Sequence, residues 1–361
     1  MAVLGLRRSL LLATRYADAR FILHARRFEP LIRFDLEGVF ARFAPDIIVP
    51  CDERAVSILN HWMSAERARL SPALLACLDR SLGTRDILHR ASKKLTLEAA
   101  RATGVRCPRD LVVNSVAECE TAAETLGYPV IMKLSHGTGG AAVKLCRTRE
   151  DLERVYKKFD RGRSIWKTLR RRLFRRDWFG GHFDILIQEH IPGQPAMSCA
   201  AAVGGATVSI VSGFAGMVIN QMGPASIVKL VNHAEIIDAT TRMVKAFGAS
   251  GFLSFDFVVD AEGRAHLLEC NPRPTQIMHL GYLVGLDLAR SYLAALQEGA
   301  PALAEQPVGE QTVAFFPQEW RRDPISVLLN SALHDVPWDD PGLMVAMVNK
   351  RPMNWRRQRI P

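Results

Sequence analysis

The sequence lacks paired cysteines, long apolar runs and internal repeats, and each absence excludes a class of protein. No CxxC pair and no metal-ligand spacing occur among its seven cysteines, which stand at positions 51, 77, 107, 119, 146, 199 and 270. An odd, scattered set predicts reduced, buried thiols in a cytoplasmic protein rather than a disulfide framework. No run approaches the roughly 18 apolar residues that a transmembrane helix requires. Without a repeat of fixed period, no solenoid is expected.

The chain is long and apolar enough for more than one core. Its 361 residues exceed the size at which a single core usually stops growing, so we expect two or three domains or lobes. Apolar residues make up 48% and charged residues 23%, the mix of an ordinary globular protein. The opening MAVLGLRRSLLLATRYADAR has no acid before Asp18, but its apolar core SLLLA is too short for a secretory signal. We therefore expect the first strand and helix of a domain there.

Positive charge is in excess and unevenly spread. The net charge is +10, and the run RGRSIWKTLRRRLFRR (161–176) holds eight basic residues and no acid. A solvated basic face is the favoured interpretation. The alternatives are attraction of an anionic substrate, of nucleic acid or of an acidic membrane surface. Nucleic acid is not expected, because no nucleic-acid motif frames the run. Interleaved aromatic residues also allow an amphipathic surface helix: Trp166, Phe174, Trp178 and Phe179.

Periodicity and turn residues predict alternating helices and strands. PDIIVP (45–50) is typical of a buried parallel strand, and a helical pattern follows it. Ser92 and Ser115 are predicted N-caps of two helices, over 92–108 and 115–127. YPVIMKLSHGTGGAAVKLCRT (128–148) indicates a strand, a glycine-rich turn and a second strand. From Met197 onward strands predominate, and we assign no structure to the tail.

One hairpin, FLSFDFVVDAEGRAHLLECNPRP, carries an unusual row of polar side chains. Residues two apart in a strand point to the same side, so Glu269 and Asn271 share a face. A turn at Ala261–Gly263 brings Asp256 of the partner strand close to Glu269. Two carboxylates and an amide oxygen suit Mg²⁺, which usually shares its coordination shell with substrate phosphates. Arg273, two residues further on, adds a bidentate donor for phosphate oxygens.

The order D…E-x-N-P-R is hard to explain by structure alone. Asn and Arg are poor strand formers, and each Pro removes a backbone donor. The hairpin resembles the ATP-grasp superfamily, which includes the ATP-binding parts of biotin carboxylase, the carbamoyl-phosphate synthetase large chain and D-alanine–D-alanine ligase. The resemblance implies that Asp256, Glu269 and Asn271 bind magnesium. It also implies that Arg273 is a catalytic, phosphate-contacting residue.

Two lysines and a glycine loop occur in the order expected of that superfamily. Lys93, in SKKLTLEAARATGVRCP, resembles its first phosphate-contacting lysine, and Lys94 is the competing candidate. Lys133 resembles its second, which ends a strand before a glycine-rich loop and is implied to be catalytic. Glycines in such a loop let backbone N–H groups close over phosphates. The glycines that match are Gly137, Gly139 and Gly140.

The segment QEHIPG resembles the interlobe hinge whose backbone groups bind adenine in the superfamily. The implied nucleotide contacts are Gln188, Glu189, His190, Ile191 and, beside the metal row, Leu268. The following GQPAMS has no acid where many relatives carry one for the ribose, which leaves Gln194 or Glu189 for that contact.

Two acids and two histidines outside these motifs could be functional or structural. Asp52 and Glu53 lie where relatives place substrate- or interface-facing residues, but acids are also favoured at a helix N-terminus. Cys270 points away from the metal row, so core packing is expected. His136 and His279 could contact substrate or be structural.

The resemblance implies an α/β protein with α+β lobes that bind ATP between them. A Rossmann-like α/β domain (1–90) would precede an ATP-grasp domain (91–300) and a C-terminal extension of unknown role (301–361). The ATP-grasp domain would consist of a lid lobe (about 115–190) and a metal-binding lobe (about 191–300).

The implied activity is that of a ligase that forms C–N bonds and releases ADP and phosphate. ATP with two Mg²⁺ ions, or Mn²⁺ as an alternative, would activate a small carboxylate as an acyl phosphate for attack by an amine or thiol. The alternatives are kinase- or carboxylase-type phosphoryl transfer and a non-catalytic, ATP-binding regulatory module. No biotin-carrier motif of the AMKM kind is present, and the complete set of acids argues against a pure binder. Family members often dimerise, so a homodimer stays open.

Overall fold

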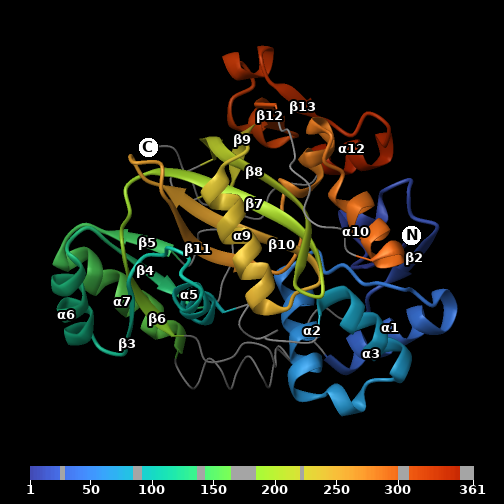
Figure 1. Ribbon diagram of the computed structural model, residues 1–361, viewed down its shortest axis with the longest axis horizontal. Helices are drawn as coiled ribbons and strands as arrows, with labels where there is room; N and C mark the ends of the chain where they lie inside the picture. The colour runs from blue at the N-terminus through green and yellow to red at the C-terminus, as the bar shows by residue number, and fades with distance from the viewer. Residues whose placement is uncertain are drawn as a thin grey trace.

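The computed structural model describes residues 1–24, 29–83, 92–135, 143–163, 184–219, 223–299 and 309–349 (Figure 1). An N-terminal part, a small lobe and a large central sheet follow one another along the chain. Within these ranges, no helix has both the length and the apolar character needed to cross a membrane.

The N-terminal part is a short parallel sheet packed with helices. Its elements are β1 (Ala2–Gly5), η1 (Leu10–Leu12), β2 (Ala19–Ile22), α1 (Glu29–Phe43), α2 (Glu53–Ala65), η2 (Arg67–Arg69) and α3 (Pro72–Leu82). β1 pairs with β2 in parallel. Trp62, Leu74 and Leu78 are fully buried in the core between the helices.

Two expectations for this part are corrected. The run PDIIVP is not a strand. Instead of pairing with another strand, Ile48 donates its backbone N–H to Ser81 Oγ at the end of α3, at 2.7 Å. A short apolar run between prolines can satisfy its backbone this way, and its composition is the same as that of a strand. The helix expected near residue 10 is only the single 3₁₀ turn η1.

The small lobe is an antiparallel sheet with two helices. It consists of β3 (Asp110–Val113), α6 (Val116–Leu126), β4 (Val130–Leu134), β5 (Val143–Cys146), α7 (Arg149–Arg163) and β6 (Ile185–Glu189), and the strand order is β3-β6-β4-β5. Its core joins the sheet to both helices. The predicted N-cap is confirmed, since Ser115 Oγ accepts from Glu118 N at 3.1 Å.

The central sheet has seven strands in the order β11-β10-β7-β8-β9-β12-β13. Its strands are β7 (Gln194–Val203), β8 (Ala206–Val218), β9 (Ala225–Leu230), β10 (Gly251–Val259), β11 (Ala265–Asn271), β12 (Gln311–Phe315) and β13 (Leu333–Asp335). Helix α9 (Ala234–Phe247) covers one face and α10 (Leu288–Glu298) the other, each with its own apolar core. α5 (Lys93–Ala102) packs against β11, next to the small lobe (Figure 1).

The described part of the C-terminal extension is built onto this sheet. β12 pairs antiparallel with β9, and β13 pairs with β12 in parallel. The remaining elements are η3 (Met278–Val284), α11 (Gln318–Arg322), η4 (Val327–Asn330) and α12 (Pro341–Asn349). Buried Glu319 accepts a hydrogen bond from Ser226 of β9 at 2.7 Å, which fixes α11 to the sheet.

Candidate active site

The β10–β11 hairpin brings Asp256, Glu269 and Asn271 together. Asp256 lies opposite Glu269 in the antiparallel register, and Ser254 lies opposite Asn271. Asn271 Nδ2 donates to Asp256 Oδ2 at 3.1 Å. The next pair in register is Phe257 with Leu267, so Leu268 is an extra residue in β11 and forms a bulge. The bulge lies directly beside Glu269.

The two carboxylates have opposite pKa shifts. Burial and the neighbouring charge of Glu269 raise the pKa of Asp256 to about 8. Burial also acts to raise the pKa of Glu269, but the Lys93 ammonium outweighs it and the pKa is lowered. Such a pair keeps one negative charge readily and a second only when a cation is added. The arrangement therefore suits a divalent metal ion bound by oxygen ligands.

Lys93 is the first residue of α5 and forms an ion pair with the acids. Its Nζ lies 2.6 Å from Glu269 Oε2, and both side chains are largely buried. Ser92 caps the helix, as predicted, by accepting from Leu95 N at 3.4 Å. Of the two competing lysines, Lys93 therefore is the one in contact with Glu269.

Lys133 points into the same region from the small lobe. It lies on β4, opposite Leu186 of β6, and its side chain is only 3% exposed. Burial and the positive charge of Lys93 lower the pKa of Lys133 to about 8, although Glu269 acts in the other direction. A buried ammonium of this kind is ready to bind an anion, because a partner of opposite charge would remove the cost of its burial.

Arg273 contacts the N-terminal part of the protein. Its Nε donates to Glu53 Oε1 at 2.9 Å. Asp52 instead caps α2, accepting from Arg54 N and Ala55 N at 3.0 and 2.8 Å. Asp52 therefore has the structural role of a helix cap, whereas Glu53 faces the candidate site.

The predicted hinge connects β6 to β7. Gln188 is buried, and its Nε2 has no hydrogen-bond partner within the described residues. An unpaired buried donor is costly, so a ligand acceptor such as a purine nitrogen would fit this position. A Cβ on Gly193 would stand 2.2 Å from Val259 O, so only glycine permits this close approach of the hinge to β10.

Glu189 is held by Arg109, at the entry of the small lobe. Arg109 donates to its two carboxylate oxygens from Nε and Nη2, at 3.2 and 3.3 Å. Burial acts to raise the pKa of Glu189, but the hydrogen bonds from Arg109 outweigh it and the pKa is lowered. Its carboxylate is thus engaged, whereas Gln194 is exposed. Gln194 and Glu189 both stay predicted candidates for the ribose contact. His190, Ile191 and Leu268 are half-buried around the hinge.

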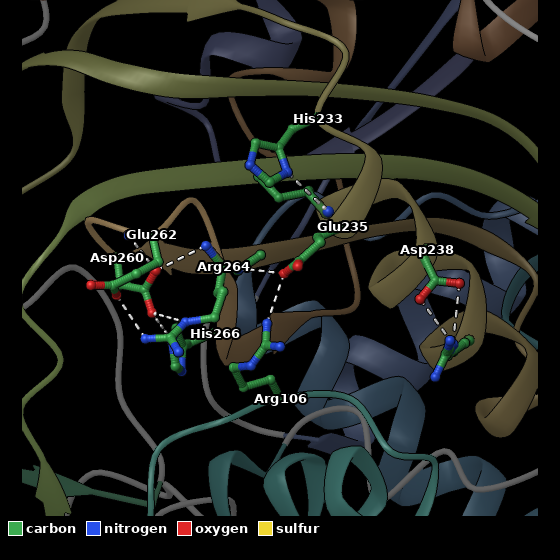
Figure 2. Close-up of polar contacts among 11 residues, drawn as sticks. Arg106, His233, Glu235, Asp238, Asp260, Glu262, Arg264 and His266 are labelled. Atoms are coloured by element: carbon green, nitrogen blue, oxygen red, sulfur yellow. Dashed lines mark hydrogen bonds and ion pairs between the residues drawn. The ribbon is translucent and has the colours of Figure 1, made fainter.

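A polar network missed by sequence reasoning holds the entry segment of the small lobe to the central sheet (Figure 2). Arg106 Nη1 lies 2.7 Å from Glu235 Oε2 at the start of α9, and the same carboxylate oxygen accepts from Ala265 N at 2.8 Å. In the adjoining turn, His266 and Arg264 contact Asp260 at 2.9 and 2.8 Å. Burial acts to raise the pKa of Asp260, but the contacts with His266 and Arg264 outweigh it and hold this pKa well below its usual range.

The remaining predicted residues lie partly outside the described part of the chain. Gly137, Gly139 and Gly140 lie outside the described residues, as do His136 and nearly all of the basic run 161–176. His279 pairs with Asp335 of β13 at 2.8 Å, which supports its structural interpretation. Cys270 is buried in the core beneath the hairpin, as expected. Among the described residues no group of three His, Cys, Asp or Glu could hold a metal, so any ion here would also need Asn271 or ligand oxygens.

Two models of known protein families match parts of this chain. Residues 184–315 match the family described as ATP-grasp in the biosynthetic pathway with Ter operon. Residues 90–164 match the ATP-binding domain of the carbamoyl-phosphate synthase L chain. The chain is an ATP-dependent enzyme of the ATP-grasp superfamily, to which it belongs by both fold and sequence.

Three relatives show the range of chemistry around this fold. A D-alanine–D-alanine ligase of Pseudomonas entomophila is 26% identical over 265 residues, which cover 68% of this chain and 76% of that one. The biotin carboxylase domain dimer of Hydrogenobacter thermophilus 2-oxoglutarate carboxylase, solved with MgADP and bicarbonate, has a TM-score of 0.63 at 15% identity, covering 86% of this chain and 67% of that one. The L-amino acid ligase of Bacillus licheniformis has a TM-score of 0.56 at 16% identity, covering 82% and 68%.

Proposed function

We propose that this protein is a carboxylate–amine ligase that uses MgATP and releases ADP and phosphate. The observation that carries the proposal is the convergence of Asp256, Glu269 and Asn271 with Lys93 and Lys133, from three separate parts of the chain. Oxygen ligands beside two ammonium groups match the needs of a magnesium-bound polyphosphate. The similarity to a D-alanine–D-alanine ligase supports the choice of a ligase.

We assign a role to each group. Asp256, Glu269 and Asn271 would hold one or two Mg²⁺ ions, while Lys93, Lys133 and Arg273 would orient the phosphates and offset their charge. Gln188 to Ile191 and Leu268 would hold the adenosine. Bound MgATP would supply the phosphoryl group that activates a substrate carboxylate. The amine, or a thiol, would then displace phosphate from the acyl phosphate and give an amide or thioester.

The small lobe would act as a lid in this reaction. Acyl phosphates hydrolyse, so the site must exclude water while the second substrate attacks. The Arg106–Glu235 and Arg109–Glu189 pairs flank the entry to the lobe and would limit its movement to a hinge there. We place the reaction in the cytoplasm, and the dimeric biotin carboxylase relative keeps a homodimer as part of the proposal.

Nucleotide product analysis tests the proposed function. Purified protein with MgATP is supplied with pooled carboxylates, bicarbonate included, with and without pooled amines. We expect ADP and phosphate to be released in equal amounts when one carboxylate pool and its amine are both present, and much less of both when the amine is left out. AMP and pyrophosphate would contradict the acyl-phosphate route. ADP formed without release of phosphate would indicate a kinase instead.

A further inference from the structure

Helix α12 is apolar on every side, yet none of its nine residues is buried. Its sequence, PGLMVAMVN, contains no charged residue, and Val345 and Val348 are each 54% exposed. A helix that is apolar all round is normally covered by protein or lipid. The described fold leaves the outer side of α12 open.

This helix lies against the N-terminal segment of the chain. Thr14 Oγ1 and Arg15 N donate to Asp340 Oδ2 just before α12, at 2.6 and 3.0 Å. The helix itself packs on η1, and both lie on the side of the molecule that carries the N-terminus (Figure 1). Segments more than 300 residues apart in sequence thus form one surface.

The apolar members of this surface are large and strongly exposed. Trp338 is 71% exposed, Tyr16 52% and Leu11 38%. We call the surface formed by Leu11, Tyr16, Trp338, Val345 and Val348 the terminal face. Exposed apolar clusters of this kind mark sites of interaction with another surface.

Basic residues border the terminal face. Arg7, Arg8, Arg15 and Arg20 are all exposed on the N-terminal segment. Three carboxylates lie among them. Asp18 pairs with the N-terminal ammonium, Asp339 accepts a hydrogen bond from the Tyr16 hydroxyl, and buried Asp340 accepts from Thr14 and Arg15.

The positive charge around the terminal face favours one kind of partner. A second copy of this chain would bring the same arginines against one another, at a net charge of +10 per chain. An apolar surface with tryptophan and bordering arginines is instead typical of proteins that lie on an anionic lipid surface. Nucleic acid would leave the apolar helix uncovered.

We propose that the terminal face docks on the surface of an anionic phospholipid bilayer. α12 and Trp338 would enter the headgroup region, while Arg7 and Arg8 contact lipid phosphates. Arg15 and Arg20 donate to backbone carbonyls of the face itself and would add positive charge beside it. The protein would lie on the membrane without crossing it. This inference is independent of the ligase reaction.

Vesicle sedimentation tests the proposal directly. The 361-residue protein is mixed with vesicles of phosphatidylcholine alone, or of phosphatidylcholine with roughly 30% phosphatidylglycerol, which gives a strong negative surface potential. We expect binding only to the anionic vesicles, with a blue shift of tryptophan emission that is smaller in Trp338→Phe. Each arginine is expected to contribute about fivefold, so Arg7→Gln/Arg8→Gln should weaken partitioning about 25-fold.

The matched control removes two exposed basic residues at the far end of the molecule. Arg149→Gln/Lys157→Gln, on α7, should leave partitioning unchanged. Nucleotide binding should be the same in all variants, which shows that they are folded. Absence of binding to anionic vesicles, or equal loss in both double variants, would overturn the proposal. A dimer in analytical ultracentrifugation that Trp338→Ala dissociates would also overturn it, because the face would then belong to a second copy.

Discussion

Glu269→Gln is expected to lower the rate of Mg²⁺-dependent ADP formation by about 10²- to 10³-fold. Glu269 is the point at which the candidate metal row and the lysines meet, since it lies opposite Asp256 and 2.6 Å from Lys93. The amide has nearly the same shape but no charge. It would weaken metal binding and leave the Lys93 ammonium without its carboxylate. The measurement is the initial rate of ADP release at saturating MgATP, over a range of Mg²⁺ concentrations.

The control for this variant comes from the same hairpin. Glu262 is an exposed carboxylate in the turn that pairs with Arg264, so Glu262→Gln should retain the wild-type rate. If Glu269→Gln also keeps that rate, the metal site is assigned to the wrong residues. A loss that is equal in both variants would show damage to the hairpin rather than to a metal site.

Lys133→Met is expected to make the protein more stable and to weaken MgATP binding. Because burial lowers the pKa of Lys133 from 10.5 to about 8, the charged form costs about 3 kcal/mol in the folded state at pH 7. The cost is fully present below pH 8, falls as the pH rises from 8 to 10.5, and is gone well above pH 10.5, where the lysine is neutral in both states. Methionine of similar size removes it, so the free energy of unfolding should rise by about 1–3 kcal/mol at pH 7.

MgATP binding should weaken in Lys133→Met because the ammonium that is unfavourable in the unliganded protein would bind a phosphate in the complex. A charged hydrogen bond to phosphate contributes about 1.5–3 kcal/mol, so MgATP affinity should fall about 10- to 100-fold. Denaturant unfolding between pH 7 and 10 measures the first effect, and calorimetric titration measures the second. Lys144→Met, on the adjacent strand β5, should change neither. A less stable Lys133→Met protein would contradict the account of a buried, unfavourable charge.

Local patterns predicted the active-site hairpin well. The period of two and the glycine turn sufficed to place Asp256 near Glu269, and Gly263 does adopt a positive φ of 79°. Helix starts were equally readable, because Ser92 and Ser115 cap α5 and α6 through contacts with residues three positions along. These features depend on neighbours in sequence, which a single chain displays directly.

What the sequence could not show depends on tertiary contacts. The bulge at Leu268 breaks the period of two, and no residue type in HLLEC announces it. Glu53 reaches Arg273 across 220 positions. Arg106 and Glu235 are ordinary surface-type residues until the fold brings them together. The pattern of PDIIVP predicts a strand wrongly, because apolar composition cannot distinguish a segment that pairs with a strand from one that packs on a helix.

The contact between Glu53 and Arg273 ties the N-terminal part to the candidate phosphate site. Both side chains are partly buried, at 36% and 20% exposure, and they come from different parts of the chain. A substrate bound against the start of α2 would therefore lie beside the arginine that we assign to the phosphates. This gives the N-terminal part a role in the reaction that its own short sheet does not reveal.

Calorimetric titration of MgATP is the measurement that tests the central claim most directly. Wild-type protein and Asp256→Asn are compared at pH 7, with Mg²⁺ and with the metal chelated. We expect one ATP per chain, bound in a Mg²⁺-dependent manner by the wild type and at least about tenfold more weakly by Asp256→Asn. Binding of equal strength without Mg²⁺, or unaffected by the substitution, would contradict it.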